Sequence, residues 1–268
     1  MISVIIPTYQ HAGTIADCLD SIFGQTLKPD EMIVVNDGST DGTSEVLRQF
    51  EMKNWRQAPR YCFSFGSDLS PISFGKATPP VLSPDCPELT VIDQENRGAQ
   101  AARNRGWKAS RGDLLLFCDA DVRMHPDMLE KMSAALAAHP EASYAYGAFR
   151  FGWKTFGGIP FSADRLREYN FIHTSSLVRA KDFPGFDESI KRLQDWDVWL
   201  TMLEAGKTGI LVPEILCDVA VDGTSRIGSS WLPRFLYRIP WNRIGWMPRV
   251  MRRYHEARAV LAKKHHLL

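Results

Sequence analysis

The sequence predicts an α/β fold in which a mostly parallel sheet is flanked by helices, and three observations indicate this fold class. Short apolar runs alternate with segments of helical periodicity through the first half of the chain. Short polar clusters follow four of these runs, at the strand ends where ligands of parallel sheets gather. The chain has 268 residues, of which 44% are hydrophobic, so it can bury a sizeable core.

Each predicted strand is an apolar or alternating run that ends in a turn. The strands are expected, in order, at residues 3–7, 31–37, 89–94, 114–119 and 143–151. Each predicted helix carries apolar residues at helical spacing, as Ile15, Leu19 and Ile22 show in the first. The helices are expected at residues 14–25, 43–50, 99–110, 127–139 and 194–207. Thr14 is the expected N-cap of the first helix, and Gly98 precedes the third.

Two segments depart from this alternation. Residues 54–88 contain six prolines and little periodicity, so a functional flap and a disordered loop are equally good interpretations. Residues 226–268 contain ten Lys or Arg and one acid, Glu256, with tryptophans and other aromatic residues between the arginines. This basic amphipathic extension suits an anionic membrane surface, and packing on the acidic body of the chain or in a dimer is the alternative.

Composition and missing motifs exclude several classes of protein. The net charge of +1 argues against a polyanion binder, so no nucleic acid partner is expected. Five widely spaced cysteines without metal-ligand spacing indicate reduced thiols, and neither a signal peptide nor a membrane span is evident, so a cytoplasmic location is expected. The sequence lacks GxGxxG after its first strand and lacks GxxxxGK[ST], which argues against a dinucleotide dehydrogenase and a P-loop enzyme.

Two carboxylates, Asp119 and Asp121, stand where the fourth predicted strand ends. In a turn after a strand, both can flank one polar ligand. Hard oxygen donors suit Mg²⁺ or Mn²⁺, which keeps several waters and takes further oxygens from a substrate diphosphate. His125 follows closely, and a solvated turn histidine is the favoured interpretation over a metal ligand.

Six segments together resemble the family 2 inverting glycosyltransferases. They read, in chain order, SVIIPTYQHAGTIADCLDSIFGQT, VVNDGSTDGT, NRGAQAARNRGW, FCDADVRMHPDML, FPGFDE and LQDWDVWLTMLEAG. The resemblance covers roughly residues 1–220 apart from 54–88. It implies a GT-A fold over 1–225, with a nucleotide half at about 1–122 and an acceptor half at about 123–225.

The resemblance also implies a nucleotide-sugar donor, commonly a UDP-sugar, a divalent metal such as Mn²⁺ or Mg²⁺, and roles for ten residues. The expected nucleotide-sugar-binding residues are Pro7, Thr8, Tyr9, Asp37, Gly98, Arg103, Asp119, Ala120 and Asp121. Asp121 is the expected direct metal ligand with Asp119 beside it, and Asp195 is the expected catalytic base. Asn36, Val122 and Gln194 stand where many relatives have acids, which leaves the base and the sugar open.

The predicted function is therefore inverting transfer of one sugar to a hydroxyl of a glycan, lipid-linked or other acceptor. The absence of a QxxRW sequence favours a non-processive enzyme. A nucleotide-sugar-binding accessory protein without transferase activity is the alternative, and a nucleotidyltransferase is a more distant one.

Overall fold

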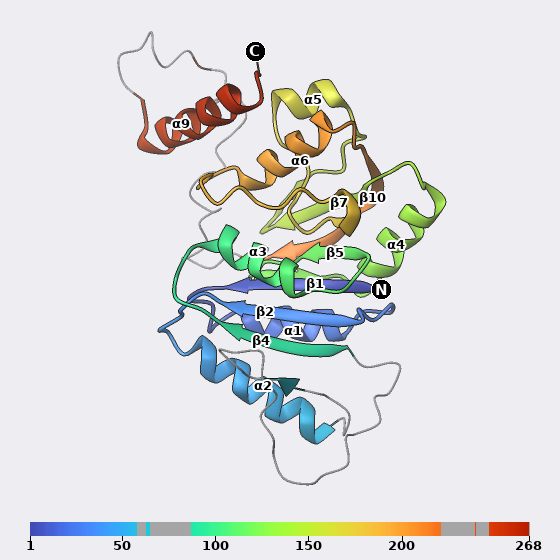
Figure 1. Ribbon diagram of the computed structural model, residues 1–268, viewed down its shortest axis with the longest axis vertical. Helices are drawn as coiled ribbons and strands as arrows, with labels where there is room; N and C mark the ends of the chain where they lie inside the picture. The colour runs from blue at the N-terminus through green and yellow to red at the C-terminus, as the bar shows by residue number, and fades with distance from the viewer. Residues whose placement is uncertain (58–62, 65–86, 221–238, 240–246, 268) are drawn as a thin grey trace.

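The computed structural model describes residues 1–57, 63–64, 87–220, 239 and 247–267, and it confirms the predicted fold class (Figure 1). Its strands are β1 Ile2–Thr8, β2 Glu31–Asn36, β3 Phe63–Ser64, β4 Glu88–Asp93, β5 Leu114–Phe117, β6 Val122–Met124, β7 Tyr144–Phe151, β8 Lys154–Phe156, β9 Leu177–Arg179 and β10 Gly209–Val219. Its helices are α1 Ile15–Phe23, α2 Thr43–Gln57, α3 Ala99–Ala109, α4 Met128–Ala138, α5 Ala163–Glu168, the short 3₁₀ turn Ala180–Asp182, α6 Gln194–Glu204 and α9 Arg249–Lys264.

The strands form one sheet whose order is β3-β4-β2-β1-β5-β9-β7-β10-β6, with β8 paired to β7. The first five strands in this order are parallel, while β9 runs antiparallel to both β5 and β7. The carboxyl ends of β1, β2, β4 and β5 therefore meet at one edge of the sheet. This edge is where parallel α/β sheets place their ligands.

Helices cover both faces of the sheet, and strand alternation assigns apolar side chains to each face. On one face, Val4 and Ile6 of β1 pack in a core cluster with Leu19 of α1 and with residues of α2 and α4. On the other face, Ile5 of β1 lies in a second cluster with residues of α5, α6 and α9. The result is a three-layer arrangement of helices, sheet and helices.

Helix α3 packs closely against β1 and β2, and Gly106 makes this approach possible. A Cβ built at Gly106 would lie 2.4 Å from Cγ2 of Ile5 and 3.2 Å from Cγ2 of Val35. Side-chain atoms do not approach so closely, so any larger residue would push α3 off the sheet. This packing fixes the helix that carries Arg103.

Residues 54–88 begin differently from the prediction of a wholly irregular segment. Helix α2 continues to Gln57 rather than ending near residue 50, and Phe63–Ser64 form strand β3 beside β4. The predicted helix 43–50 is therefore too short, because α2 lasts longer than its apolar spacing indicates. Residues 58–62 and 65–86 lie outside the described part of the chain.

The C-terminal extension contributes a helix that packs on the body of the protein. Helix α9 buries Met251 and Leu261, and Leu261 joins the cluster that contains Trp196 and Trp199 of α6. The first part of the extension, residues 226–238 and 240–246, lies outside the described residues. In the part of the chain that the structure describes, no helix is both long and apolar enough to cross a membrane.

Candidate active site

The carboxyl ends of β1 and β2 place Thr8 and Asp37 side by side. The Asp37 amide donates a hydrogen bond of 2.9 Å to the Thr8 carbonyl, which continues the pairing of the two strands past their ends. The Thr8 side chain is 2% exposed, and its buried hydroxyl has no hydrogen-bond partner. A buried hydroxyl without a partner is uncommon, and at a ligand-binding edge it suits a group that arrives with the ligand.

The Asp37 carboxylate organises the turn that begins α3. Its Oδ1 accepts hydrogen bonds from the amide of Arg97 at 2.8 Å and from Nε2 of Gln94 at 2.7 Å. Its Oδ2 accepts from the amide of Gly98 at 2.8 Å, and Gly98 has a φ of 94° that favours glycine. The N-terminus of a helix attracts negative charge, and at α3 the Asp37 carboxylate supplies it. Contact between Asp37 and a nucleotide base stays a prediction.

Arg103 of α3 is a buried cation with unused donors. Its Nη2 donates to Oδ1 of Asp119 at 2.5 Å, and its guanidinium lies 5.2 Å from the centre of the Phe186 ring. The residue is only 3% exposed, yet its Nε and Nη1 have no hydrogen-bond partner. Burying unpaired guanidinium donors is unfavourable. The arrangement therefore suits an anion that binds between Arg103 and the rim.

Asp119, Ala120 and Asp121 form the turn between β5 and β6. The Val122 amide donates to the Asp119 carbonyl at 2.9 Å, and the Asp121 carbonyl accepts from the Ala220 amide at 2.8 Å. Burial raises the pKa of Asp119, but Arg103, His173 and His11 together bring it below its ordinary value. Asp119 is therefore ionised at neutral pH although burial opposes its ionisation.

The donor set of this turn fits a magnesium or manganese ion that is held largely by its substrate. Among the described residues, no group of three or more His, Cys, Asp or Glu could hold a metal. Mg²⁺ commonly uses only one or two protein carboxylates together with waters and phosphate oxygens. Asp121 and the second oxygen of Asp119 can supply such carboxylates, and the unpaired donors of Arg103 beside them suit the phosphate.

Asp195 of α6 lies near this cluster, since the charges of Arg103 and Asp119 both act on its carboxyl group. It lies in the first turn of α6, where its Oδ2 accepts from Nδ2 of Asn170 at 2.8 Å and its Oδ1 accepts from the Trp196 amide at 2.9 Å. Burial raises its pKa against the opposing effects of the Trp196 amide and Arg103, and the negative charge of Asp119 adds to the rise. A carboxylate with a raised pKa is a better proton acceptor than an ordinary one.

Asp195 is the second residue of α6, so it does not occupy the N-cap position of that helix. The N-cap position is Leu193, which has the left-handed φ of 58° and makes no side-chain cap. Left-handed backbone at a non-glycine residue is uncommon and is found near functional sites. By contrast Thr14 stands at the expected N-cap of α1, but its hydroxyl pairs with Nδ1 of His11 rather than capping the helix.

His173 is a third titratable group of the site. Burial lowers its pKa to about 4, with the positive charge of Arg103 adding to this and Asp119 opposing it. Its Nδ1 accepts from the Ser175 amide at 3.2 Å, and its ring lies 4.3 Å from that of Phe149, measured between centroids. The imidazole is thus neutral at pH 7, with its proton on Nε2.

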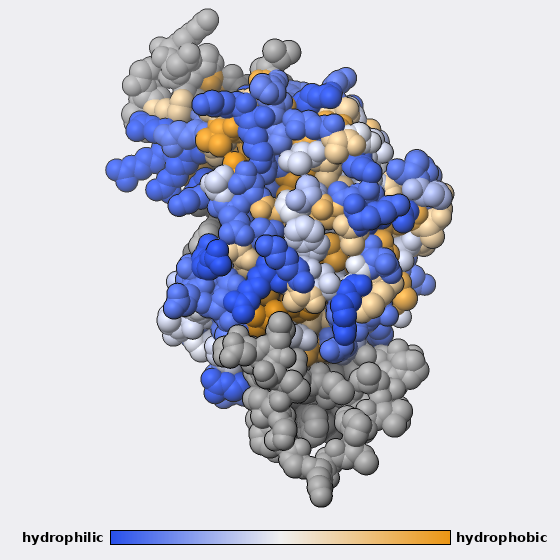
Figure 2. Space-filling model, in the orientation of Figure 1, coloured by the Kyte–Doolittle hydropathy of each residue, from blue (hydrophilic) through white to orange (hydrophobic). Residues whose placement is uncertain are grey.

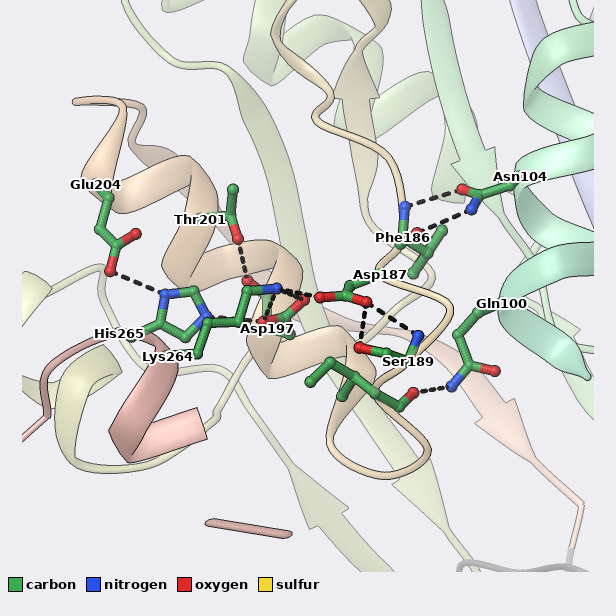
Figure 3. A network of polar contacts seen from close by, with 11 residues as sticks. Gln100, Asn104, Phe186, Asp187, Ser189, Asp197, Thr201, Glu204, Lys264 and His265 are labelled. Carbon is green, nitrogen blue, oxygen red and sulfur yellow. Dashed lines mark hydrogen bonds and ion pairs between the residues drawn. The ribbon is translucent and has the colours of Figure 1, made fainter. Parts of the chain in front are cut away.

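The loop that precedes α6 ties the two halves of the site together. Asn104 of α3 accepts from the Phe186 amide at 2.9 Å and donates to the Phe186 carbonyl at 2.8 Å (Figure 3). Gln100 of α3 donates to the Ile190 carbonyl further along this loop. Helix α3 thus positions both Arg103 and the segment that leads to Asp195.

The remaining predicted residues also lie at or near this edge. Pro7 and Ala120 are buried, and Tyr9 is 37% exposed. His125 is half-buried and its Nε2 lies 3.2 Å from Asp218, so it is paired rather than solvated. Asn170 was not anticipated, because its role depends on a partner 25 residues away and no local motif marks it.

Comparison with solved structures confirms the fold. The sheet and its flanking helices match GT-A glycosyltransferases. With TarS 1-349 of S. aureus in complex with UDP-GlcNAc, the TM-score is 0.61 at 18% identity, covering 86% of this chain and 61% of that chain. With the mannosyltransferase PcManGT of Pyrobaculum calidifontis, in complex with GDP-Man and Mn²⁺, the TM-score is 0.60 at 20% identity, covering 97% and 69%.

The sequence then gives the family. Residues 3–61 and 77–189 match glycosyl transferase family 2, and the chain belongs to this family. A relative is the uncharacterized glycosyltransferase YibD of Escherichia coli, 31% identical over 181 residues, which are 66% of this chain and 43% of that protein. The chain thus spans less than half the length of that relative.

Proposed function

We propose that this chain is an inverting, non-processive glycosyltransferase that moves one sugar from a nucleoside-diphosphate sugar, most simply a UDP-sugar, to an acceptor hydroxyl. The observation that carries the proposal is the position of Arg103. This buried guanidinium has two unpaired donors and is hydrogen-bonded to Asp119 on the nucleotide side. Its positive charge also opposes the rise in the pKa of Asp195, which would lie on the acceptor side. A diphosphate beside Arg103 would put its sugar between the two carboxylates.

In the proposed reaction, Asp195 takes the proton of the acceptor hydroxyl as its oxygen attacks the anomeric carbon. The bond from that carbon to the diphosphate oxygen breaks, and the diphosphate leaves with the bonding electron pair. Attack from the side opposite the leaving group inverts the anomeric configuration. Asn170 and the Trp196 amide hold the Asp195 carboxylate by its two oxygens, so a lone pair on each remains for the hydroxyl proton.

On the donor side, Arg103 would offer its unpaired N–H groups to the diphosphate as negative charge develops there. A Mn²⁺ or Mg²⁺ ion held by Asp121 and Asp119 would supply further positive charge for the leaving group. The buried Thr8 hydroxyl and the exposed Tyr9 ring would contact the nucleotide at the ends of β1. The complexes of TarS with UDP-GlcNAc and of PcManGT with GDP-Man and Mn²⁺ support this assignment by fold.

The experiment combines calorimetry of UDP binding with a transfer assay. We expect UDP to bind in the presence of Mn²⁺, and labelled UDP-sugars to give a product with inverted configuration, identified by NMR. UDP binding without transfer to any cell-derived acceptor would favour the accessory-protein alternative. Failure to bind any nucleoside diphosphate would contradict the proposal, and pyrophosphate release from a nucleoside triphosphate would indicate a nucleotidyltransferase.

A further inference from the structure

His173 is an accessible side chain in an otherwise buried segment. It lies between α5 and β9, and it is half-buried, whereas every other residue from 171 to 176 is fully buried. Helix α5 lies beside α6, the helix that carries Asp195 (Figure 1). The segment therefore brings one accessible imidazole to the part of the protein that holds the proposed base.

The imidazole of His173 is held so that one nitrogen stays available. Its Nδ1 accepts a hydrogen bond from the Ser175 amide at 3.2 Å, and its carbonyl accepts one from the Ser176 hydroxyl at 2.7 Å. The ring lies against Phe149, with 4.3 Å between the ring centres. Because Nδ1 is an acceptor, the proton of the neutral ring is on Nε2. Nε2 is therefore a hydrogen-bond donor, and it has no partner among the described residues.

His173 lies close to both sides of the proposed reaction. The charges that act on it are those of Asp119 and Arg103, which would hold the metal and the diphosphate. The same two residues act on the carboxyl group of Asp195. Asn170, which donates to Asp195 at 2.8 Å, precedes His173 by three residues, and three residues of chain span at most about 11 Å. The imidazole is therefore near the leaving group and near the base.

This position is where the donor sugar has to lie. In a direct displacement the anomeric carbon stands between the base and the departing diphosphate, so the sugar ring comes beside His173. The ring carries hydroxyl groups, each of which can accept a hydrogen bond from Nε2. Ser175 supplies a second polar group in the same turn, since it is 3% exposed and its hydroxyl has no partner. A buried hydroxyl without a partner is uncommon and suits a group that arrives with a ligand.

The groups offered to the sugar are uncharged. A neutral imidazole N–H and the Ser175 hydroxyl both suit a hydroxyl or an amide of the ligand. Arg103 already pairs with Asp119, so a sugar carboxylate would lie among the negative charges of Asp119 and Asp195. On the face that Figure 2 shows, hydrophilic residues predominate and hydrophobic residues form small patches, which suits a polar ligand. A neutral sugar therefore fits this part of the site.

We propose that His173 is a specificity-determining residue, which donates a hydrogen bond from Nε2 to a ring hydroxyl of the donor sugar. The inference rests on the proposed function, since it names the class of sugar that the nucleoside diphosphate carries. This class is a neutral hexose or N-acetylhexosamine in which that hydroxyl is free. A site built to hydrogen-bond a substrate hydroxyl discriminates against the analogue that lacks it, because the N–H is then left unpaired.

The test is calorimetry of the full chain with Mn²⁺, in which each nucleotide sugar is compared with its own nucleoside diphosphate. The probes are UDP with UDP-glucose, UDP-galactose and UDP-N-acetylglucosamine, and GDP with GDP-mannose. His173→Ala should weaken the best-binding nucleotide sugar about tenfold, the effect of one hydrogen bond, and leave its nucleoside diphosphate unaffected. His173→Gln should recover most of the affinity, because its amide keeps an N–H donor near the place of Nε2. His139→Ala is the matched control, since this side chain is 44% exposed at the end of α4.

Monodeoxy analogues of the best-binding nucleotide sugar then identify the hydroxyl. The wild type should bind one analogue about tenfold less tightly than the parent, whereas His173→Ala should bind that analogue and the parent equally. Thermal unfolding of each variant shows that it is folded, and His173→Gln serves the comparison if His173→Ala is not.

Several results would overturn the inference. An equal loss of affinity for the nucleotide sugar and for its nucleoside diphosphate in His173→Ala would mean that His173 acts on the diphosphate or on the packing of the site. A deoxy effect of the same size in the wild type and in His173→Ala would assign the hydroxyl to another residue. Binding of UDP or GDP without binding of any of the sugars would also contradict it. If the wild type binds neither UDP nor GDP, the proposed function itself fails, and this is recognised before any variant is made.

Discussion

Arg103 shows at the scale of one residue how the chain prepares a site at the expense of stability. A buried donor left without a partner destabilises the folded state by about 1–3 kcal/mol, and Arg103 has two such donors. Its contact with Asp119 compensates part of this, because the pair is close and largely shielded from water. An anionic ligand that meets the remaining donors would recover the rest, so substrate binding and local stability are linked at this residue.

At the same scale, Asp195→Asn should stay folded and bind UDP, yet transfer sugar at least about 100-fold more slowly. An amide cannot take the acceptor proton, although it keeps the shape of the carboxylate. It also loses one acceptor towards Asn170 or the Trp196 amide, so a small fall in the unfolding midpoint is expected. Turnover rates of both proteins and their UDP affinities decide this. Near-normal turnover would reject Asp195 as the base.

Asp121→Ala should remove the dependence of UDP binding on Mn²⁺. One of few protein oxygen ligands is lost, and the charge of the diphosphate is left without compensation. Calorimetry of UDP with and without Mn²⁺ measures the effect. Asp127→Ala is the matched control, since Asp127 pairs with Lys131 at the start of α4 and faces no expected ligand. An unchanged Mn²⁺ effect in Asp121→Ala would contradict the metal assignment.

At the scale of secondary structure elements, the sequence predicts what is decided locally. The strands β1, β2, β4 and β5 and the polar residues at their ends follow from apolar runs and turns, so Asp37 and Asp119 were found. The three-residue strands β6, β8 and β9 are too short to carry a pattern of their own. Pairing with distant strands defines β6 and β9, and β8 pairs with its chain neighbour β7. Similarly, nothing local indicates that Asn170 supports Asp195.

The same limit applies to α9. Its sequence shows a basic, aromatic extension, and both a membrane surface and packing on the body suited it. The structure shows that its last turn is held to α6 and its neighbouring loop by Lys264 and His265. The partners Asp187 and Asp197 are 77 and 67 residues from Lys264, so no spacing could reveal them. Membrane contact by the extension stays a prediction.

Lys264→Met tests this junction through its pH dependence. The hydrogen bond from Lys264, with further bonds from Ser189, lowers the pKa of Asp187 from 3.8 to about 2. The folded carboxyl thus holds its proton less tightly than the unfolded one, so the contact stabilises the protein above about pH 3.8 and is lost as the pH falls towards 2. Lys264→Met should lose about 1.5–3 kcal/mol at pH 7, and this difference should shrink as the pH falls through that range.

Urea unfolding at several pH values measures the difference, and Lys263→Met is the control, since Lys263 is exposed and forms no ion pair among the described residues. A difference between wild type and Lys264→Met that stays constant from pH 7 to pH 2 would show that the contact with Asp187 contributes nothing.

For the whole molecule, the question is how far the C-terminal extension belongs to the folded body. Figure 1 shows α9 beside α6 and away from the edge of the sheet near α2. The core cluster that α9 joins through Leu261 includes Trp196 and Trp199, whereas Thr8 and Asp37 lie at the carboxyl ends of β1 and β2. We therefore expect α9 to stabilise the acceptor half and to leave nucleotide binding unaffected.

A chain that ends at residue 246 should unfold at a lower temperature than the full chain and still bind UDP. Removing α9 exposes the apolar surface under Leu261, and burial of one such side chain contributes about 2–5 kcal/mol. Asp197 then becomes accessible to water, so its charge needs no partner. Asp197→Asn should therefore destabilise the full chain, where it breaks the contacts with Lys264 and His265, but should have almost no effect in the shortened chain. Thermal unfolding of the four proteins measures this coupling, and an equal effect of Asp197→Asn in both backgrounds would mean that α9 does not hold Asp197 in solution.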